Sequence, residues 1–327
     1  MKAQEMASLV EVAARRIQPY VLHTPLLHTQ PMSQLTGVSV YLKLENEQVT
    51  GSFKVRGAFN KTLELLSGGD QVKSVYTAST GNHGLASGLA FRTLGVAGKV
   101  VVPKTADREK KEKLREAGCD LIEHGTDCEQ AETHARSLAN QANLPYLSPY
   151  NDYHVMAGQG TIGLEILEDL PDVDAILVAV GGGGLIGGIA AYIKTKRPQC
   201  QVVGCSPAKS KVMHESAKAG RLIREESHET LSDATAGMLE DGTVTFPMCR
   251  DLVDSWVLLE EEEIAEAVYY CLKHHKKVVE GAAGVALAAV HKISPSYQGK
   301  KVAVVMCGAN ISMKNLHKII STHADTT

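Results

Sequence analysis

The predicted strands of this chain are uninterrupted apolar runs, and helical segments alternate with them. The clearest runs span residues 99–102, 175–180, 202–203 and 302–306. A strand that is apolar on both sides is buried on both faces, as happens when helices cover a parallel sheet from above and below. The pattern therefore predicts an α/β fold with mainly parallel sheets covered by helices. We find no low-complexity linker and no internal repeat.

The composition is that of a globular protein with room for one large core and a second, smaller one. Of the 327 residues, 44% are hydrophobic and 22% are charged, and the formal net charge is −3. This balance gives no basic footprint for nucleic acid. No apolar run approaches the ~18 residues that a membrane span needs, and residues 1–9 lack the apolar segment of a signal peptide. We expect a cytoplasmic protein that binds neither nucleic acid nor membrane.

The seven cysteines predict reduced thiols rather than disulfides or a zinc site. Their number is odd and they lack paired short spacings. The histidines give no metal site either, because the spacing of His83, His154, His274 and His275 is that of ordinary surface or helix histidines. The cysteines are Cys119, Cys128, Cys200, Cys205, Cys249, Cys271 and Cys307.

One lysine lies in a setting that suits covalent chemistry. It is Lys54, in the run Gly51-Ser52-Phe53-Lys54-Val55-Arg56-Gly57, between a predicted strand (38–44) and a predicted helix (58–66). Small and aromatic neighbours would hold the side chain in place, and a lysine attacks carbonyl groups well only when its position and pKa are controlled. The alternative interpretation is a surface lysine at the start of a helix.

A polar turn follows the extended residues 74–78 and opens a predicted helix. Its residues are Ser79, Thr80, Gly81, Asn82, His83 and Gly84. The first N–H groups of a helix are unpaired and carry partial positive charge, so a turn of small and hydroxyl residues there can hold a carboxylate or a phosphate. An ordinary N-cap is the alternative, because serine and threonine are favoured at that position in any case.

A second turn, rich in glycine, follows the apolar run at 175–179 and also precedes a helix. It reads Gly181-Gly182-Gly183-Gly184-Leu185-Ile186-Gly187-Gly188. Consecutive glycines let several N–H groups converge on one oxyanion, which favours a phosphate cradle. The turn also matches a dinucleotide-binding pattern, but the following strand ends in Cys205-Ser206-Pro207 without the acidic residue that a nicotinamide cofactor requires. We therefore disfavour a nicotinamide-dependent dehydrogenase.

Taken together, these motifs closely resemble those of the serine racemase and threonine dehydratase family of fold type II pyridoxal-phosphate enzymes. The resemblance covers about residues 7–318. It implies a tryptophan synthase β-like fold, with Lys54 as the Schiff-base lysine and Phe53 under or beside the cofactor ring. It implies a cradle for the 5′-phosphate at Gly181, Gly182, Gly183, Gly184 and Leu185. The run Ala157-Gly158-Gln159-Gly160-Thr161, ahead of a predicted helix at 162–170, is another stretch typical of the family.

The resemblance also assigns the substrate side of the site. Ser79, Thr80, Gly81, Asn82 and His83 would bind the substrate carboxylate, and Asn82 would also reach the phenolic oxygen of the cofactor. It places a small mobile domain at residues 70–148, inserted into a large cofactor-binding domain made of residues 1–69 and 149–327, so that closure of the small domain would exclude water from the site. It further implies that the C-terminal regulatory domain of biosynthetic threonine dehydratases is absent, and we expect a homodimer.

Two residues at the predicted cofactor edge bear on the reaction. Cys307 stands where the family places a serine or cysteine at the ring nitrogen, and Glu280 would lie at the edge of the ring. A neutral thiol holds a pyridinium proton weakly, which shortens the life of a carbanion and favours loss of a β-leaving group. The resemblance therefore predicts β-elimination from a β-hydroxy amino acid such as L-threonine or L-serine, giving a 2-oxo acid and ammonia. The alternatives are a buried small hydrophobe at Cys307 and a helix-dipole carboxylate at Glu280.

Three alternatives to a dehydratase remain. A serine racemase on the same scaffold needs a second acid or base, and the racemase serine in that role aligns with Thr80, whose β-branch restricts the hydroxyl. The other two are the dehydrogenase and a non-catalytic amino-acid sensor. We predict no metal site, because Ser206 and Val212 stand near where some relatives place a glutamate and an aspartate, and hard cations need several oxygen ligands.

Overall fold

Two mainly parallel sheets form the scaffold of the computed structural model, which describes residues 1–68 and 72–324. Six strands form the larger sheet in the order β1-β2-β9-β6-β7-β8, and three form the smaller sheet in the order β3-β4-β5. Within the described residues, the β1–β2 pair is antiparallel and the other neighbouring strands run parallel. The strands are β1 (Leu26–His28), β2 (Ser39–Lys43), β3 (Ser74–Ala78), β4 (Ala97–Val102), β5 (Asp120–Glu123), β6 (Ala175–Ala179), β7 (Gln201–Pro207), β8 (Ser255–Leu259) and β9 (Lys301–Val305).

The central strands of the larger sheet are apolar on both sides, as the sequence predicts. All five residues of β6 are buried, and Leu177 pairs with Val203 of β7 on one side and with Val304 of β9 on the other. A sheet buried in this way needs helices on both faces. Helix α12 packs on β6 to β9 and α8 packs on β6 and β7, so the prediction of an α/β fold with parallel sheets covered by helices is confirmed.

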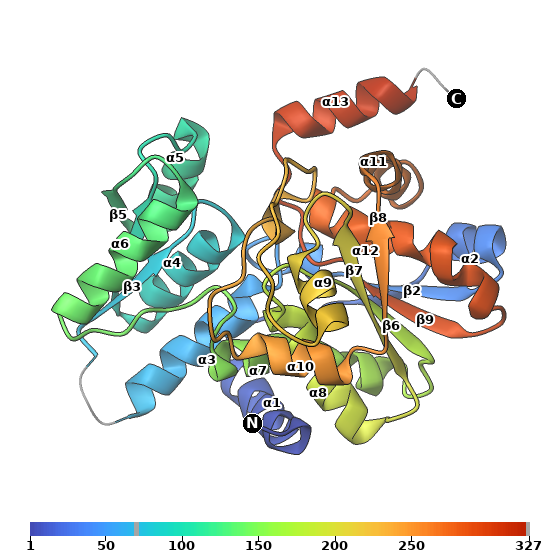
Figure 1. The fold of residues 1–327 in the computed structure, drawn as a ribbon, viewed down its shortest axis with the longest axis horizontal. Helices are drawn as coiled ribbons and strands as arrows, with labels where there is room; N and C mark the ends of the chain where they lie inside the picture. The colour runs from blue at the N-terminus through green and yellow to red at the C-terminus, as the bar shows by residue number, and fades with distance from the viewer. Residues whose placement is uncertain (69–71, 325–327) are drawn as a thin grey trace.

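The helices surround the two sheets (Figure 1). They are α1 (Ala3–Ile17), α2 (Gln30–Thr36), α3 (Lys54–Ser67), α4 (Asn82–Leu94), α5 (Arg108–Glu116), α6 (Cys128–Gln141), α7 (Tyr153–Asp169), α8 (Gly184–Lys196), α9 (Val212–Ala219), α10 (Thr245–Leu252), α11 (Glu261–Tyr270), α12 (Gly281–Ile293) and α13 (Met313–Ala324). Shorter turns are η1 (Glu45–Glu47), η2 (Asp233–Thr235), η3 (Cys271–His275) and η4 (Ser294–Ser296).

Helix α7 begins earlier than predicted. The sequence predicts a helix from residue 162, but α7 begins at Tyr153, where the Asp152 side chain caps it by accepting from the His154 and Val155 N–H groups. The run 157–161 therefore lies inside the helix. A Cβ on Gly158 would lie 2.6 Å from the Arg56 carbonyl oxygen, so the glycines of this run allow a close helix crossing, which the sequence pattern hides.

The smaller sheet lies beside the larger one, and α3 runs between them (Figure 1). A hydrophobic cluster joins the two parts: Val55 and Phe59 of α3 pack with Val75 of β3 and Ala86 of α4. The chain returns through a parallel bridge between Tyr76 and Tyr146. The first predicted domain boundary, at residues 69 and 70, lies outside the described residues.

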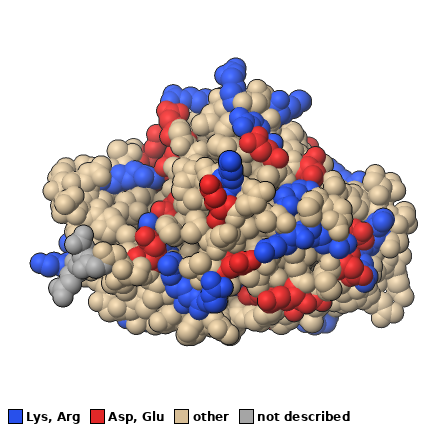
Figure 2. Space-filling model, turned by 90° about the horizontal axis from the view of Figure 1, so that it is seen from below, with Lys and Arg blue, Asp and Glu red and all other residues tan. Residues whose placement is uncertain are grey.

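Charges of both signs are mixed on the surface (Figure 2), and the cysteines are reduced thiols. On the face in Figure 2, basic and acidic side chains are intermixed among uncharged residues. Among the described helices, none is long and apolar enough to cross a bilayer. All seven cysteines are free, and Cys128 is the exposed one among them.

Candidate active site

Lys54 is the first residue of α3, at the junction between the two sheets. Its Nζ donates to the carbonyl oxygen of Pro149 over 2.8 Å and lies 5.3 Å from the centroid of the Phe53 ring. Burial lowers the pKa of Lys54 from 10.5 to about 8, against the attraction of Glu280 and Cys307. A substantial fraction of this amine is therefore neutral near pH 7.5, as a nucleophile or a base requires.

A buried ion cluster anchors the first turn of α3. The Arg56 side chain, which is 0% exposed, donates to both carboxylate oxygens of Glu45 over 2.7 and 2.8 Å and to both of Glu165 over 2.6 and 3.0 Å. The ammonium of Lys43 lies 2.6 Å from Glu165 and 3.6 Å from the partly exposed Asp169, so each buried carboxylate has a cationic partner. Arg56 carries no predicted role in the sequence, although it lies in the Lys54 motif. Its position two residues after Lys54, in the same motif, was the available signal.

The polar turn after β3 lies where α4 begins, at Asn82. The Ser79 hydroxyl accepts from the Gly81 N–H over 3.1 Å, which shapes the turn. Asn82 donates from Nδ2 to both carboxylate oxygens of Glu280, over 2.9 and 3.0 Å. This contact joins the smaller-sheet region to the start of α12, and Thr80 lies partly buried in the same turn.

His83 is buried, which corrects the expectation of an exposed helix histidine. Thr77 donates its single hydroxyl proton to the Leu147 carbonyl, so the hydroxyl oxygen accepts from His83 Nε2 over 2.9 Å. Burial, followed by the charge of Lys54, lowers the pKa of His83 to about 3. The ring is therefore neutral and ties α4 to β3. Sequence spacing alone could not show that this helix face lies against the sheet.

The glycine turn opens α8, which begins at Gly184. Gly183 has φ +82°, a left-handed conformation that favours glycine. A Cβ on Gly181 would lie 2.9 Å from the Thr235 Cα, and one on Gly182 would lie 2.4 Å from the Tyr150 ring. The turn therefore has no room for side chains. The first N–H groups of α8, from Gly184 and Leu185 onward, lack acceptors within the helix.

Glu280 and Cys307 lie close to Lys54 although they are far from it in sequence. Glu280 is 3% exposed and precedes α12, and its side chain bonds Asn82 instead of capping its own helix. Burial raises the pKa of Glu280 from 4.5 to about 7, against hydrogen bonding from Asn82. Burial also raises the pKa of the Cys307 thiol well above its usual value, with a further contribution from Glu280. Cys307 is therefore a neutral thiol.

The positions of these residues follow from the topology. Lys54 is tied to Cys307 by the hydrogen bond from the Phe53 N–H to the Cys307 carbonyl over 3.1 Å, and to Pro149 by its own amine. Tyr150, the next residue, packs on Gly182. Cys307 follows β9 and Gly181 follows β6, so both lie at the carboxyl edge of the larger sheet, where α/β proteins place their sites.

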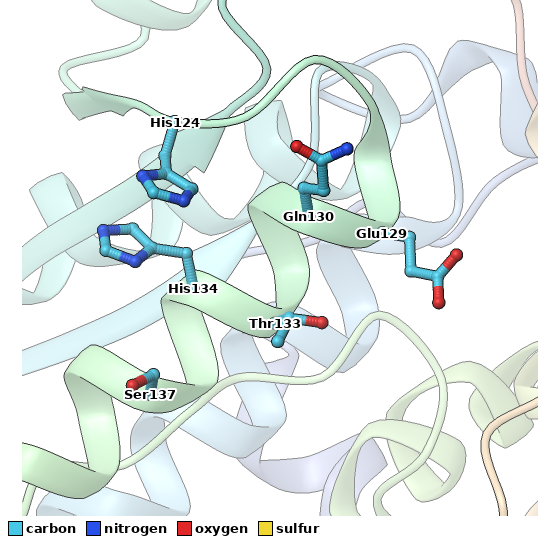
Figure 3. A pocket seen from close by; sticks show the side chains of 6 residues that line it. All are labelled: His124, Glu129, Gln130, Thr133, His134 and Ser137. Carbon is cyan, nitrogen blue, oxygen red and sulfur yellow. The ribbon is translucent and has the colours of Figure 1, made fainter.

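A separate surface pocket lies on α6, away from these residues (Figure 3). The rings of His124 and His134 stack there with centroids 3.6 Å apart, and Glu129 points away from them. Within residues 1–68 and 72–324, no three His, Cys, Asp or Glu side chains lie together so that they could hold a metal ion. Ser206 donates to the Val180 carbonyl over 3.4 Å, and Val212 begins α9.

The comparison with family models identifies the chain. Residues 17–308 match the model described as pyridoxal-phosphate dependent enzyme. The chain belongs to this family. The predicted membership, fold class and cofactor are confirmed, and no support remains for a nicotinamide-dependent dehydrogenase.

The chain is similar to curated threonine-degrading enzymes over nearly its whole length. An L-threonine ammonia-lyase of Thermotoga maritima is 40% identical over 313 residues, which cover 95% of this chain and 77% of that protein. The catabolic L-threonine dehydratase TdcB of Escherichia coli K12 is 35% identical and covers 94% of this chain and 93% of its own. These relatives confirm that the chain is an enzyme of the lyase class.

Solved structures agree with this assignment. Threonine deaminase isoform 2 of Solanum lycopersicum superposes with a TM-score of 0.92 at 30% identity, covering 99% of this chain and 90% of that one. Maize serine racemase superposes with a TM-score of 0.89 at 29% identity, covering 98% of both chains. The fold thus accommodates both elimination and racemisation, so the choice between them depends on particular side chains.

Proposed function

We propose that this enzyme removes the β-hydroxyl and the amino group of L-threonine or L-serine, giving a 2-oxo acid and ammonia. The main support is that the buried Lys54 amine lies close to the neutral thiol of Cys307. The chain is also 40% identical to an L-threonine ammonia-lyase. A racemase remains the second candidate, since maize serine racemase shares the fold.

The described residues fit pyridoxal phosphate. Lys54 offers a partly desolvated amine for the cofactor aldehyde, and the N–H groups at the start of α8 suit a phosphate. The Ser52 hydroxyl, two residues before Lys54, is buried and has no hydrogen-bond partner among the described residues, which leaves a polar group for a ligand. When bound, the cofactor supplies a conjugated ring that spreads the charge left by loss of the substrate α-proton.

The protein residues would divide the remaining tasks. The N–H groups at the start of α4, with Ser79, Thr80, Gly81 and Asn82, would bind the substrate carboxylate. His83, also expected to bind it, is buried and bonded to Thr77, so it would hold the turn in place instead. Lys54 would take the α-proton, because a pKa of about 8 leaves roughly a fifth of the amine neutral at physiological pH, far more than an ordinary lysine. Cys307, as a neutral thiol, would contact the ring nitrogen without holding a proton there strongly, which favours prompt departure of the hydroxyl. Phe53 would pack on the ring.

Closure of the small domain would exclude water from these steps. We propose that residues 70–148 form this domain and that residues 1–69 and 149–327 form the cofactor-binding domain. The contact between Asn82 and Glu280 supports this proposal, because it joins the two parts directly at the site. We further propose a homodimer located in the cytoplasm.

The test is a panel of β-hydroxy amino acids with purified enzyme, scored for 2-oxo acid and ammonia, together with Lys54→Ala. We expect release from threonine or serine and a loss of at least roughly 10³-fold in Lys54→Ala, because one amine serves as both carrier and base. The variant should remain folded and should lose the absorbance band of the covalently held cofactor. Near-normal 2-oxo acid production by Lys54→Ala would refute the assignment.

A further inference from the structure

Asn310 bonds three segments that meet at the candidate site. Its Nδ2 donates to the Thr50 carbonyl over 3.0 Å and to Asn82 Oδ1 over 2.6 Å, and its backbone N–H donates to Glu280 Oε2 over 3.2 Å. These partners precede α3, begin α4 and precede α12. Asn310 therefore touches the Lys54 motif, the polar turn and the carboxylate of Glu280 at once.

These contacts fix which way both amide groups point. The Thr50 carbonyl can only accept, so the end of the Asn310 amide that faces it is the nitrogen. The same nitrogen lies 2.6 Å from the Asn82 amide, which must present its oxygen there. The other end of Asn82 is then its NH₂ group, which donates to both oxygens of Glu280. The chain of donors runs in one direction only.

The backbone before Lys54 is shaped to admit Asn310. Gly51 has φ +70°, and a Cβ there would lie 3.2 Å from Asn310 Oδ1. The Ala309 N–H donates to the Gly51 carbonyl over 2.8 Å, so the two segments are also joined through the backbone. A glycine at this point thus meets two demands at once, a left-handed backbone and room for the Asn310 side chain.

We propose that Asn310 is a positioning residue that keeps the NH₂ group of Asn82 turned toward the cofactor edge. This inference rests on the proposed function and on the family resemblance, which implies that Asn82 reaches the phenolic oxygen of the cofactor. Without Asn310 the Asn82 oxygen loses its donor, and only the bonds to Glu280 still hold the amide. An amide that turned over would present its oxygen to the phenolic oxygen, replacing an attraction with a repulsion. The role belongs to the Asn310 donor and not to the volume of the side chain.

The experiment compares Asn310→Asp, Asn310→Ala and wild type. Aspartate keeps the shape of asparagine but cannot donate in its ionised form, so a space-filling role would leave Asn310→Asp unchanged. The matched control is Asn140→Asp, which makes the same substitution at an exposed position near the end of α6. Thermal unfolding and circular dichroism establish that each variant is folded.

Two readouts follow. Hydrogen exchange of the apoprotein, which needs no cofactor, should rise several-fold at residues 79–85 in both Asn310 variants and stay unchanged in Asn140→Asp. Titration with pyridoxal phosphate should show binding weakened about tenfold in both Asn310 variants. If Asn310→Asp matches wild type in either readout, the inference is wrong even when wild type releases ammonia. A different result would be that both Asn310 variants exchange faster than wild type at residues 79–85, but wild type itself never binds pyridoxal phosphate. In that case the proposed function fails, and with it the role assigned to Asn310.

Discussion

At the scale of single residues, the site combines groups whose pKa shifts all favour the uncharged form of the side chain. The Lys54 amine is lowered to about 8, the Glu280 carboxyl is raised to about 7, and the Cys307 thiol is raised further. Burial is the first cause in each case. The opposite charges of Lys54 and Glu280 limit each other's shift, whereas Glu280 adds to the shift of Cys307. Displaced pKa values in one cluster are typical of a catalytic site.

The choice between elimination and racemisation should depend on Thr80. If its hydroxyl is a proton donor opposite Lys54, Thr80→Ser frees it from the β-branch and should raise the ratio of D-serine to pyruvate, and Thr80→Ala should abolish D-serine. In both variants the rate of elimination should change less than the rate of racemisation, because the α-proton leaves on the side of Lys54. Chiral chromatography of serine in deuterated water, run beside pyruvate release, measures both. An unchanged ratio in Thr80→Ser would show that the second base lies elsewhere.

Glu280 should make stability depend on pH. Folding raises the pKa of this acid from 4.5 to about 7. Its contribution to the free energy of unfolding is therefore fully present below pH 4.5 and is lost as the pH rises through 7. Wild type should therefore lose stability relative to Glu280→Gln over that window, by roughly 3 kcal/mol at most. Urea unfolding of the apoproteins at pH 5 and pH 8 measures the difference.

The control for this titration is Glu262→Gln, which removes a carboxylate from an exposed position in the first turn of α11. A difference between Glu280→Gln and wild type that is the same at both pH values would contradict the raised pKa of Glu280.

At the scale of elements, the position of Lys54 depends on how closely α3 and α7 cross. Gly158 of α7 lies against the Arg56 carbonyl and the Gly57 Cα, and the Gln159 side chain accepts from the Gly57 N–H over 3.1 Å. The first turn of α3 is thus held by α7 on one side and by the Glu45 and Glu165 carboxylates on another.

Gly158→Ala and Gly163→Ala provide a matched pair within α7. The Cβ of the first would lie 2.6 Å from a backbone oxygen, whereas that of the second would meet its nearest neighbours at 3.4 Å or more. We expect Gly158→Ala to destabilise by about 1–3 kcal/mol through overpacking and to weaken cofactor binding. Gly163→Ala should be neutral or gain up to about 1 kcal/mol from helix propensity. Unfolding in denaturant measures the free energy of unfolding of both variants. Equal changes in the two variants would refute this account of the helix crossing.

At the scale of the whole molecule, a clasp formed by Arg136, Asn151 and Glu240 joins the two proposed domains. Arg136 of α6 lies 2.7 Å from Glu240 Oε2, and Asn151 donates to the same oxygen over 2.8 Å. The Tyr150 hydroxyl accepts from the Glu240 N–H over 3.0 Å, so the clasp also fixes the ring that packs on Gly182. In the proposed closure, this clasp would be a further contact between the two domains besides that of Asn82.

Breaking this clasp should weaken closure without unfolding the protein. Arg136→Met removes a half-buried ion pair worth about 1 kcal/mol, so kcat/KM should fall roughly 3- to 10-fold, mainly through KM. Arg92→Met is the control, because Arg92 bonds the Glu116 carbonyl within the same proposed domain. Steady-state kinetics at two salt concentrations tests this. Equal losses in both variants would indicate a general surface effect.

The sequence by itself determined the elements and the class of chemistry. Apolar runs specify buried parallel strands because burial on both faces excludes polar residues, and local motifs around Lys54 and Gly181 carry their own backbone requirements. The tertiary structure decided what depends on distant segments: the burial of His83, the glycines inside α7, the partners of Arg56, and the meeting of Asn82, Glu280 and Asn310. Such contacts join residues up to 228 positions apart, and a local pattern does not encode them.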